Sequence, residues 1–344
     1  MRTLPYLFLA LFLYGCIDAY TPKGVESLSR LLVVEGNITD GESVFRLSRS
    51  IALDAFFVQE ETTVDHASLY VEQDNGERLE GVFREKGTYI VSTGSLEANR
   101  KYRLHIAVDG EVYCSEYLSP IFTAGIDSIT SVKERIGEPV QIRLYTHDPE
   151  DRSKYYMWNY KEFWEVKAEL YATYGPWEGE FIDFSRYSKY NTYYCWARDS
   201  SQGLIMASSE RQSENVIDHK ITEIYSGDRR LSEYYCIEVN QHQVRQETYD
   251  YYANVQKNVE QTGDLFSSIP SELKGNISCI SDPDLPVIGF CDVTTTVRER
   301  FYIIDLYDGY YESPMQFCHD SITESQQFHL SCLRFVCLLY KYNW

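Results

Sequence analysis

Carboxylates are the most abundant residues in this chain that could perform acid–base chemistry, and two close pairs stand out. Glu60 and Glu61 are adjacent, whereas Glu178 and Glu180 are two residues apart. Hydrolysis by such a pair requires a fold that holds both carboxyl groups across a cleft. With 52 Asp and Glu residues, chance pairs are expected. The seven histidines are scattered, no GxSxG, HExxH or P-loop motif is present, and we expect a non-enzymatic protein without a cofactor.

Cys16 has the strongest local context for covalent chemistry. It follows Arg2, an apolar run from Leu4 to Tyr14, and Gly15. The run is shorter than the roughly 20 residues of a membrane-spanning helix and fits the core of a signal peptide. A cysteine at this point resembles the lipobox of bacterial lipoproteins, in which the leader is cleaved before the cysteine and the thiol is lipidated. The alternative is an ordinary secretory signal in which Cys16 has no special role.

The lipobox interpretation divides the start of the chain into two segments. Residues 1–15 are expected to be the lipoprotein signal peptide, and residues 16–30 to be the lipidated cysteine and a tether. Each acyl methylene buried in a membrane contributes about 0.8 kcal/mol, so a multiply acylated cysteine anchors a protein stably. We therefore expect the membrane to be contacted through the lipid anchor only.

The other eight cysteines could form disulfides or a metal site. They are Cys114, Cys195, Cys236, Cys279, Cys291, Cys318, Cys332 and Cys337. Export to an oxidising compartment favours disulfides, and Cys279 with Cys291, which bracket a turn-rich loop, is the first pairing expected. The C-terminal cysteines with His319 could imitate a zinc site, but no CxxC pair occurs and no metal is expected.

An aromatic-rich zone between residues 158 and 196 is the candidate binding region. Trp158 and Tyr160 share one face of an expected strand, while Lys161 and Phe163 share the other, so both faces carry large side chains. One face can pack in a core, and the other needs a cover or a ligand. Aromatic packing between strands and helix is one interpretation. A ligand or partner surface is the other, and its candidate residues are Trp164, Tyr171, Tyr174 and Trp177.

The composition limits the partners. A formal net charge of −20 repels phosphate backbones, so we expect no nucleic acid and no attraction to an anionic membrane surface. Thirty tyrosines are typical of a sheet-rich protein. They also fit glycan or peptide recognition, because tyrosine presents a flat face with a polar tip.

The elements expected to position these residues are mostly strands. Alternating runs separated by Asn75-Gly76 and Asp109-Gly110, which favour hairpin turns, predict an immunoglobulin-like β-sandwich over residues 31–124. Residues 125–344 are expected to form a larger β-rich domain, a sandwich or partial barrel. Its one helix is expected near residues 243–261, where Val244, Tyr252 and Val255 follow helical spacing. We therefore expect an all-β protein with one capping helix.

The region around this helix carries a family resemblance. The resemblance rests on Tyr249, Tyr251 and Tyr252, followed by Gly263-Asp264-Leu265-Phe266, Pro270-Ser271, Gly275-Asn276-Ile277 and Ile288-Gly289-Phe290. These residues and their spacing resemble a Bacteroidetes lipoprotein family catalogued as domain of unknown function 4249. Leu32-Val33-Val34-Glu35-Gly36 also matches the segment that opens the first domain in this family.

The resemblance implies a role beside a TonB-dependent outer-membrane transporter. The expected function is a lipid-anchored outer-membrane protein, facing the cell exterior, that captures a ligand for the transporter. The ligand could be a glycan, a peptide or a chelated metal. One alternative is a surface interaction or structural lipoprotein without a small ligand, and another is a glycan hydrolase.

Overall fold

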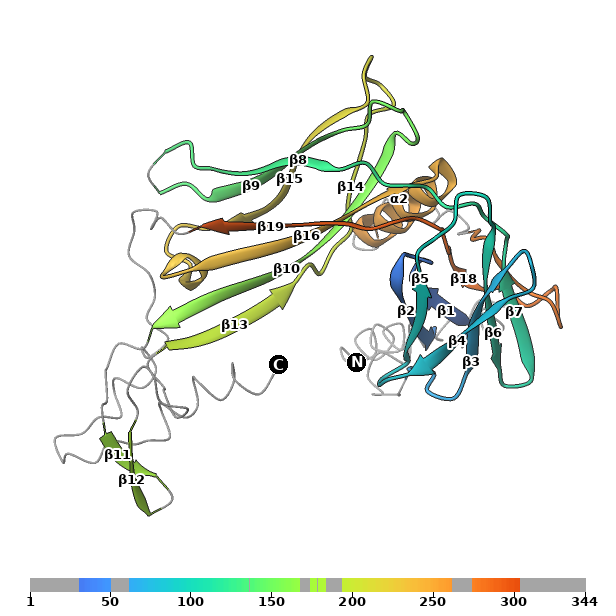
Figure 1. The fold of residues 1–344 in the computed structure, drawn as a ribbon, viewed down its shortest axis with the longest axis horizontal. Helices are drawn as coiled ribbons and strands as arrows, with labels where there is room; N and C mark the ends of the chain where they lie inside the picture. The colour runs from blue at the N-terminus through green and yellow to red at the C-terminus, as the bar shows by residue number, and fades with distance from the viewer. Residues whose placement is uncertain are drawn as a thin grey trace, which may run out of the picture.

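The protein is almost entirely β-structure. The computed structural model describes residues 31–50, 62–135, 137–167, 174–177, 179–183, 194–261 and 274–303. Within these ranges there is one α-helix, α2 (Gln246–Gln261), and it lies between two β domains (Figure 1). The prediction of an all-β protein with one helix is confirmed. No helix in the described ranges is both long and apolar enough to cross a membrane.

The first domain is a nine-stranded sheet in the order β17-β7-β6-β3-β4-β5-β2-β1-β18. Strand β4 joins two layers, and these layers lie on opposite sides of the first core (Figure 1). The strands are β1 (Leu32–Glu35), β2 (Gly41–Arg49), β3 (Ser68–Gln73), β4 (Arg78–Phe83), β5 (Thr88–Gly94), β6 (Tyr102–Val108), β7 (Glu111–Ser115), β17 (Ile277–Cys279) and β18 (Ile288–Gly289).

Strict alternation of buried and partly exposed residues along the strands builds this core. Every second residue of β6 is buried, from Tyr102 to Val108, because successive side chains of a strand point to opposite faces. The turn to β7 uses Asp109 and Gly110 with φ of 55° and 87°. Both residue types tolerate these positive values, which a two-residue hairpin turn requires. The hairpin predicted at this point is therefore confirmed.

Strands from far along the chain complete the first sheet. Strand β17 pairs with β7, and β18 pairs with β1, so residues 277–289 supply both sheet edges. The Asn276 side chain joins the edges, because its Nδ2 donates to Cys291 O at 2.8 Å and its Oδ1 accepts from Cys291 N at 2.9 Å. The expected boundaries assigned this segment to the second domain. These boundaries are wrong for residues 277–289, which belong to the first domain, because its edge strands pair with strands that lie far away in sequence.

The second domain is a sandwich of two sheets. One has the order β13-β10-β16-β19, with β14 also paired to β10, and the other has the order β15-β9-β8. Tyr156, Trp158, Ile142 and Leu144 are buried in the second core. The strands are β8 (Ile126–Val132), β9 (Val140–His147), β10 (Tyr155–Lys167), β13 (Tyr194–Ser200), β14 (Ile205–Ser208), β15 (Val216–Ile224), β16 (Tyr235–Val244) and β19 (Val297–Ile303).

Two smaller elements accompany this sandwich. A 3₁₀ turn, η3, covers Arg229–Leu231 and precedes β16. Strands β11 (Tyr174–Trp177) and β12 (Glu180–Asp183) form a separate two-stranded hairpin.

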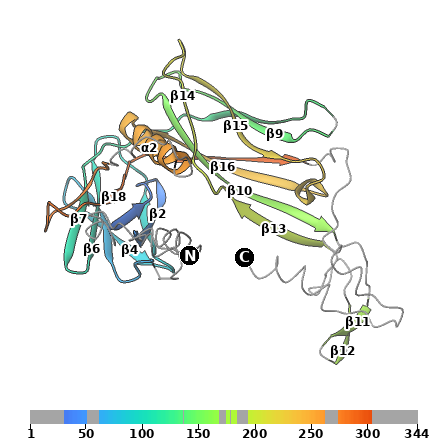
Figure 2. The ribbon, with the colours of Figure 1, turned by 180° about the vertical axis from the view of Figure 1, so that it is seen from behind.

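Helix α2 follows β16 directly and lies beside both domains (Figure 2). The helix predicted near residues 243–261 is present, but it starts at Gln246. Val244 belongs to the strand because it is paired with Tyr155, so it is not on the helical face. Tyr251 is the buried aromatic residue of the helix, and its ring lies against Phe290, with 5.7 Å between ring centroids.

The expected Cys279–Cys291 disulfide is absent. Both cysteines are buried and free, as is Cys114, and Cys236 is free and partly buried. Cys291 is bonded opposite Asn276, which lies three residues before Cys279. That offset corresponds to about 10 Å along a strand, whereas disulfide-bonded Cα atoms are at most about 7 Å apart. The other five of the nine cysteines lie outside the described residues or have undescribed side chains.

Candidate functional site

The candidate site is a cleft of about 680 Å³ between the two domains. Its floor is the open face of the sheet formed by β10, β16 and β19. Its walls come from the first domain near β1 and β2, from helix α2, and from residues 201–204. Residues from these four parts that line the cleft include Glu35, Glu42, Asn159, Lys161, Leu204, Asn240, His242, Tyr252 and Arg298. This volume is typical of small-ligand sites, which often form where domains meet.

The alternation of β10 separates core from cleft. Tyr156 and Trp158 point into the second core, with 0% and 3% of their surfaces exposed. The intervening residues, Met157, Asn159 and Lys161, lie on the other face and line the cleft. The same strand therefore supplies an aromatic core face and a polar floor, because its side chains alternate between the two sides.

A polar ladder crosses the floor from strand to strand. Asn159, Asn240 and Arg298 occupy paired positions on β10, β16 and β19. Asn240 Nδ2 donates to Asn159 Oδ1 at 2.8 Å, and Arg298 Nε donates to Asn240 Oδ1 at 2.9 Å. The ladder fixes the rotamers of both amides before a ligand arrives. Preorganisation of this kind lowers the entropic cost of binding.

His242 lies beside this ladder on the floor. It is paired with Met157, and its Nδ1 lies 3.5 Å from Thr296 Oγ1. Part of the side chain reaches the cleft, but the surrounding protein desolvates the ring. Burial, opposed by the nearby Asp40 carboxylate, lowers the pKa of His242 to about 4. The imidazole is therefore uncharged at neutral pH and can both donate and accept a hydrogen bond.

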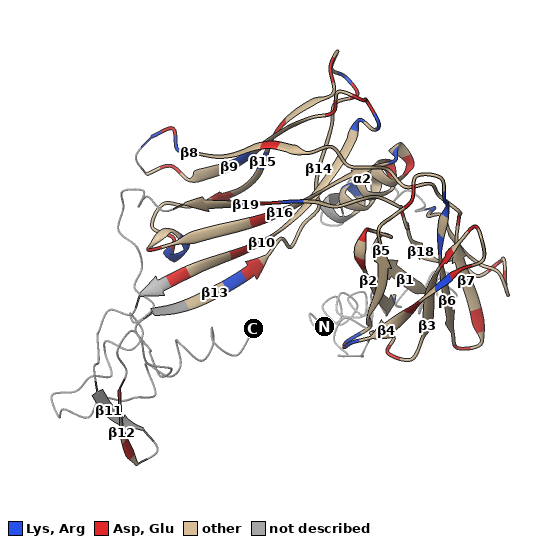
Figure 3. Ribbon diagram, viewed as in Figure 1, with Lys and Arg blue, Asp and Glu red and all other residues tan. Residues whose placement is uncertain are grey.

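The opposite wall is acidic and partly apolar. Glu35 at the end of β1 and Glu42 on β2 are exposed, and Val44 of the same strand is 51% exposed. Tyr252 and Val255 of α2 are half-buried at the end of the cleft. The sheet side of the cleft differs from this acidic wall, because basic positions on β19 lie there beside an acidic position on β16 (Figure 3).

A buried polar network behind the floor holds the linker that joins the two domains, residues 116–125 between β7 and β8. Gln243 is fully buried on β16, and its Oε1 accepts from Ala124 N at 2.7 Å, while its Nε2 donates to Asp148 Oδ2 at 2.9 Å. Gln241 Nε2 donates to Ala124 O at 2.9 Å. The backbone of the interdomain linker is thus paired to two glutamines of the floor strand. Buried polar groups need such partners, so the network fixes the linker.

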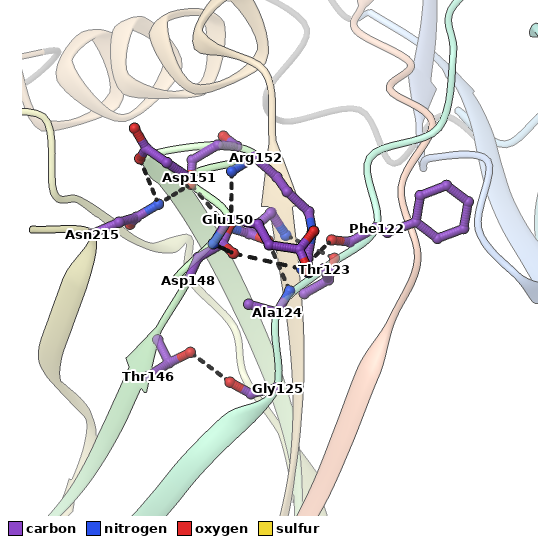
Figure 4. Close-up of polar contacts among 12 residues, drawn as sticks. Phe122, Thr123, Ala124, Gly125, Thr146, Asp148, Glu150, Asp151, Arg152 and Asn215 are labelled. Carbon is purple, nitrogen blue, oxygen red and sulfur yellow. Dashed lines mark hydrogen bonds and ion pairs between the residues drawn. The ribbon is translucent and has the colours of Figure 1, made fainter. Parts of the chain in front are cut away.

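The turn at residues 148–152 holds the same linker from the other side (Figure 4). Arg152 Nη1 donates to Phe122 O at 3.2 Å, and Arg152 N donates to Asp148 Oδ2 at 2.8 Å. Burial alone would raise the pKa of Asp148. Hydrogen bonds from Gln243 and from the turn backbone outweigh burial and hold that pKa below its ordinary value. The charged carboxylate is therefore part of the structure that holds the linker.

Of the four predicted binding residues, Trp164 is the one whose side chain the structure describes, and it does not line the cleft. Trp164 is 6% exposed and lies in the second core, on the same strand face as Trp158. Its placement on a binding surface is corrected to the alternative, aromatic packing. The backbone of Tyr174 and Trp177 belongs to β11, but the side chains of these residues are not described. Tyr171 and Cys16 lie outside the described residues.

The residues of the cleft differ from the aromatic residues that the sequence analysis predicts for binding, because a high density of aromatic rings is the stronger local signal. The alternation of side chains along β10 does indicate that one face needs a cover or a ligand. The polar residues Asn159 and Lys161 lie on that face. Asn240, His242 and Arg298 carry no sequence signal of their own, since they reach the floor only through strand pairing. Among the described residues, no three His, Cys, Asp or Glu side chains are grouped so that they could hold a metal ion.

Comparisons with known proteins address the family and the fold. Among solved structures, a two-domain fibronectin type III segment of chicken tenascin covers 62% of this chain and 90% of its own length, with 11% identity and a TM-score of 0.18. A Salmonella alpha-2-macroglobulin mutant covers 67% of this chain and 14% of its own length, with 10% identity and a TM-score of 0.19. No curated protein matches the chain.

The family comparison covers most of the chain. The profile described as "Domain of unknown function (DUF4249)" matches residues 17–300. The match includes the first domain, the floor strands of the cleft, helix α2 and the strands that complete the first sheet. The chain therefore belongs to the DUF4249 family.

Proposed function

We propose that the protein is a lipid-anchored outer-membrane protein that captures a ligand for a TonB-dependent transporter. The observation that carries the capture role is the interdomain cleft of about 680 Å³, whose floor and walls come from different domains. The lipobox-like segment ending at Cys16 supports the anchor. The resemblance to transporter-associated lipoproteins supports the partner and an orientation toward the cell exterior.

Capture in this proposal is physical and involves no covalent step. A binding protein tethered beside a barrel keeps its ligand at a high effective concentration at the barrel mouth. The cleft offers exposed apolar surface at Val44 and a preorganised amide ladder at Asn159 and Asn240. Such a site can hold a ligand reversibly, which transfer to a transporter requires.

An affinity pull-down tests the partner. The C-terminally tagged protein is purified from detergent-solubilised outer membranes, and the bound proteins are identified by mass spectrometry. Recovery of one stoichiometric TonB-dependent barrel is the expected result. Recovery of the lipoprotein alone, in detergent that preserves a known transporter complex, would contradict the proposal.

The lipid anchor gives a separate prediction. Cys16→Ala is expected to move the protein from the membrane pellet to the soluble fraction, because loss of the acylated thiol removes the buried methylenes that hold it. Fractionation followed by immunoblotting measures this shift. Cys236→Ala, at a free cysteine, is the matched control and should leave the protein in the pellet. If the Cys16 variant also remains in the pellet, the lipobox interpretation is wrong.

A second candidate function is docking of another protein without a small ligand. The observation that favours it is two exposed aromatic side chains on the sheet that forms the floor, Trp196 at 41% and Tyr302 at 57%. Exposed aromatic residues are enriched at protein interfaces. The pull-down separates the candidates, since the docking function predicts recovery of a protein other than a barrel.

A further inference from the structure

We infer that the cleft binds short peptides with a free amino terminus, using opposite charges on its two sides. The inference rests on the proposed capture function and names its ligand class. Two carboxylates of the first domain, Glu35 and Glu42, line one side, while Lys161 and Arg298 line the floor. A ligand that carries an ammonium group and carboxylates can satisfy both sides at once.

The opposing charges are available to a ligand. Glu35, Glu42 and Lys161 are exposed, and within the described part of the chain none of them has an ion-pair partner. Arg298 lies 3.5 Å from a Glu238 carboxylate oxygen, but its side chain is 62% exposed and Glu238 also pairs with a second arginine. The two sides therefore face each other across the cleft without neutralising each other. Unlike charges on opposite walls favour a ligand with separated charges of both signs.

The cationic surface continues beyond the cleft along the same sheet face. Lys161 is paired with Glu238, which is paired with Arg300, and the next row begins with Arg198 beside Phe163. Arg198 is exposed and has no ion-pair partner among the described residues. This face carries more cations than carboxylates although the whole chain has a net charge of −20. Acidic side chains of a bound peptide would meet these cations.

The dimensions fit an extended peptide. Met157 in the cleft and Phe163 in the outermost row are six residues apart on β10, a distance of about 20 Å at about 3.3 Å per residue. A peptide of about six residues spans this distance when extended. Its amino terminus would lie near Glu35 and Glu42, and its carboxylates over Lys161 and Arg198.

The same charges disfavour a glycan. A neutral glycan gains nothing from either charged side, and a polyuronate is repelled by the two unpaired glutamates. His242 also favours a peptide over a glycan, because its ring stays neutral and adds no cation beside the site of the ammonium group. A peptide is the ligand class that uses both sides of the cleft.

A peptide-retention experiment tests the inference. A peptic digest of casein is equilibrated with the Cys16→Ala protein, and the retained peptides are quantified by mass spectrometry. Short peptides with acidic residues are expected to be enriched. Acetylation of the digest, read on lysine-free peptides so that only the amino terminus changes, is expected to lower their retention at least tenfold.

Charge variants assign the effect to the cleft. Glu35→Gln/Glu42→Gln should lower retention of the free peptides at least tenfold and remove the difference between free and acetylated forms. Glu77→Gln/Glu80→Gln makes the same charge change at exposed positions that do not line the cleft, and it should retain peptides normally. Equal retention of acetylated peptides, equal retention by the cleft variant, or displacement of the peptides by oligogalacturonate at lower concentration would overturn the inference.

The peptide-retention experiment and the pull-down distinguish failure of the peptide inference from failure of the proposed function. If a barrel co-purifies but no peptide is enriched, the peptide inference fails while transporter capture stands. If peptides are enriched and no barrel co-purifies, the transporter role fails while the peptide site stands.

Discussion

Asp292→Ala is expected to lower the free energy of unfolding by about 3–5 kcal/mol, the usual cost of leaving a buried charge and its donors unpaired. The carboxylate is fully buried and joins three parts of the protein. Its Oδ2 accepts from Arg245 N at 2.9 Å and from Thr248 Oγ1 at 2.6 Å. Arg245 also donates from its guanidinium to Oδ1, which accepts from Val293 N at 2.7 Å as well.

The position of Asp292 explains why one residue has so large an effect. Its carboxylate faces the start of α2, where unpaired backbone N–H groups and the helix dipole favour a negative charge. Its backbone is bonded to the first domain, with Ile38 N donating to Asp292 O at 2.9 Å. Loss of the side chain therefore weakens the helix and the junction that together shape the cleft.

Chemical denaturation of the Cys16→Ala protein, followed by tryptophan fluorescence, measures this effect. Asp292→Asn preserves the shape and removes only the charge, so its loss of stability should fall between those of the wild type and Asp292→Ala. Asp284→Ala, at an exposed position, controls for removal of an aspartate and should cost under about 0.5 kcal/mol. Equal midpoints for Asp284→Ala and Asp292→Ala would refute the junction role.

Local patterns in the sequence are sufficient to predict the elements whose signal lies within a few neighbouring residues. The alternation in β6, the Asp109-Gly110 turn and the helical spacing after Gln246 each depend on residues close together in the chain. The start of the helix was placed about three residues early, because Val244 suits a strand and a helix equally and its pairing with Tyr155 decides between them. Tertiary pairing overrides local preference in this way whenever the local signal is ambiguous.

The cleft and the closing strands could not be predicted from local patterns. Strands β17 and β18 are short, and they are placed by pairing with β7 and β1, more than 150 residues earlier. Asn240 and Arg298 become neighbours only through the register of β16 and β19. Aromatic density in the sequence predicts a binding role for Trp164, but its indole is in the core, since large rings are suited to a core as well as to a binding surface.

The structure gives physical roles to several residues that carried the family resemblance. Asn276 joins the two sheet edges, and Tyr251 packs on Phe290 between helix and sheet. Gly289 has a φ of 150°, and a Cβ there would lie 2.4 Å from Val34 O. These residues close the first domain and attach α2 to it, so the resemblance identified the scaffold of the cleft and none of its floor.

Gly275→Ala is expected to lower the free energy of unfolding by about 3–5 kcal/mol, through steric overlap and the loss of paired hydrogen bonds. A Cβ at this position would lie 1.7 Å from Gly289 O and 2.8 Å from Gly289 C. Both atoms belong to backbone, so no side chain can rotate away to relieve the overlap. The two sheet edges must separate, which breaks the reciprocal bonds between Asn276 and Cys291.

Denaturation of the same Cys16→Ala protein tests this prediction, with Gly125→Ala as the matched control. Gly125 also lies outside the regular strands, but no atom lies within 4 Å of a Cβ built on it, so its replacement should change stability by less than about 0.5 kcal/mol. Similar midpoints for the two variants would show that the edges are not held at the distance described. A loss confined to Gly275→Ala would show that contact between the edges stabilises the first domain. Because Glu35 and Glu42 are presented by strands of that domain, the same variant should also weaken ligand retention by the cleft.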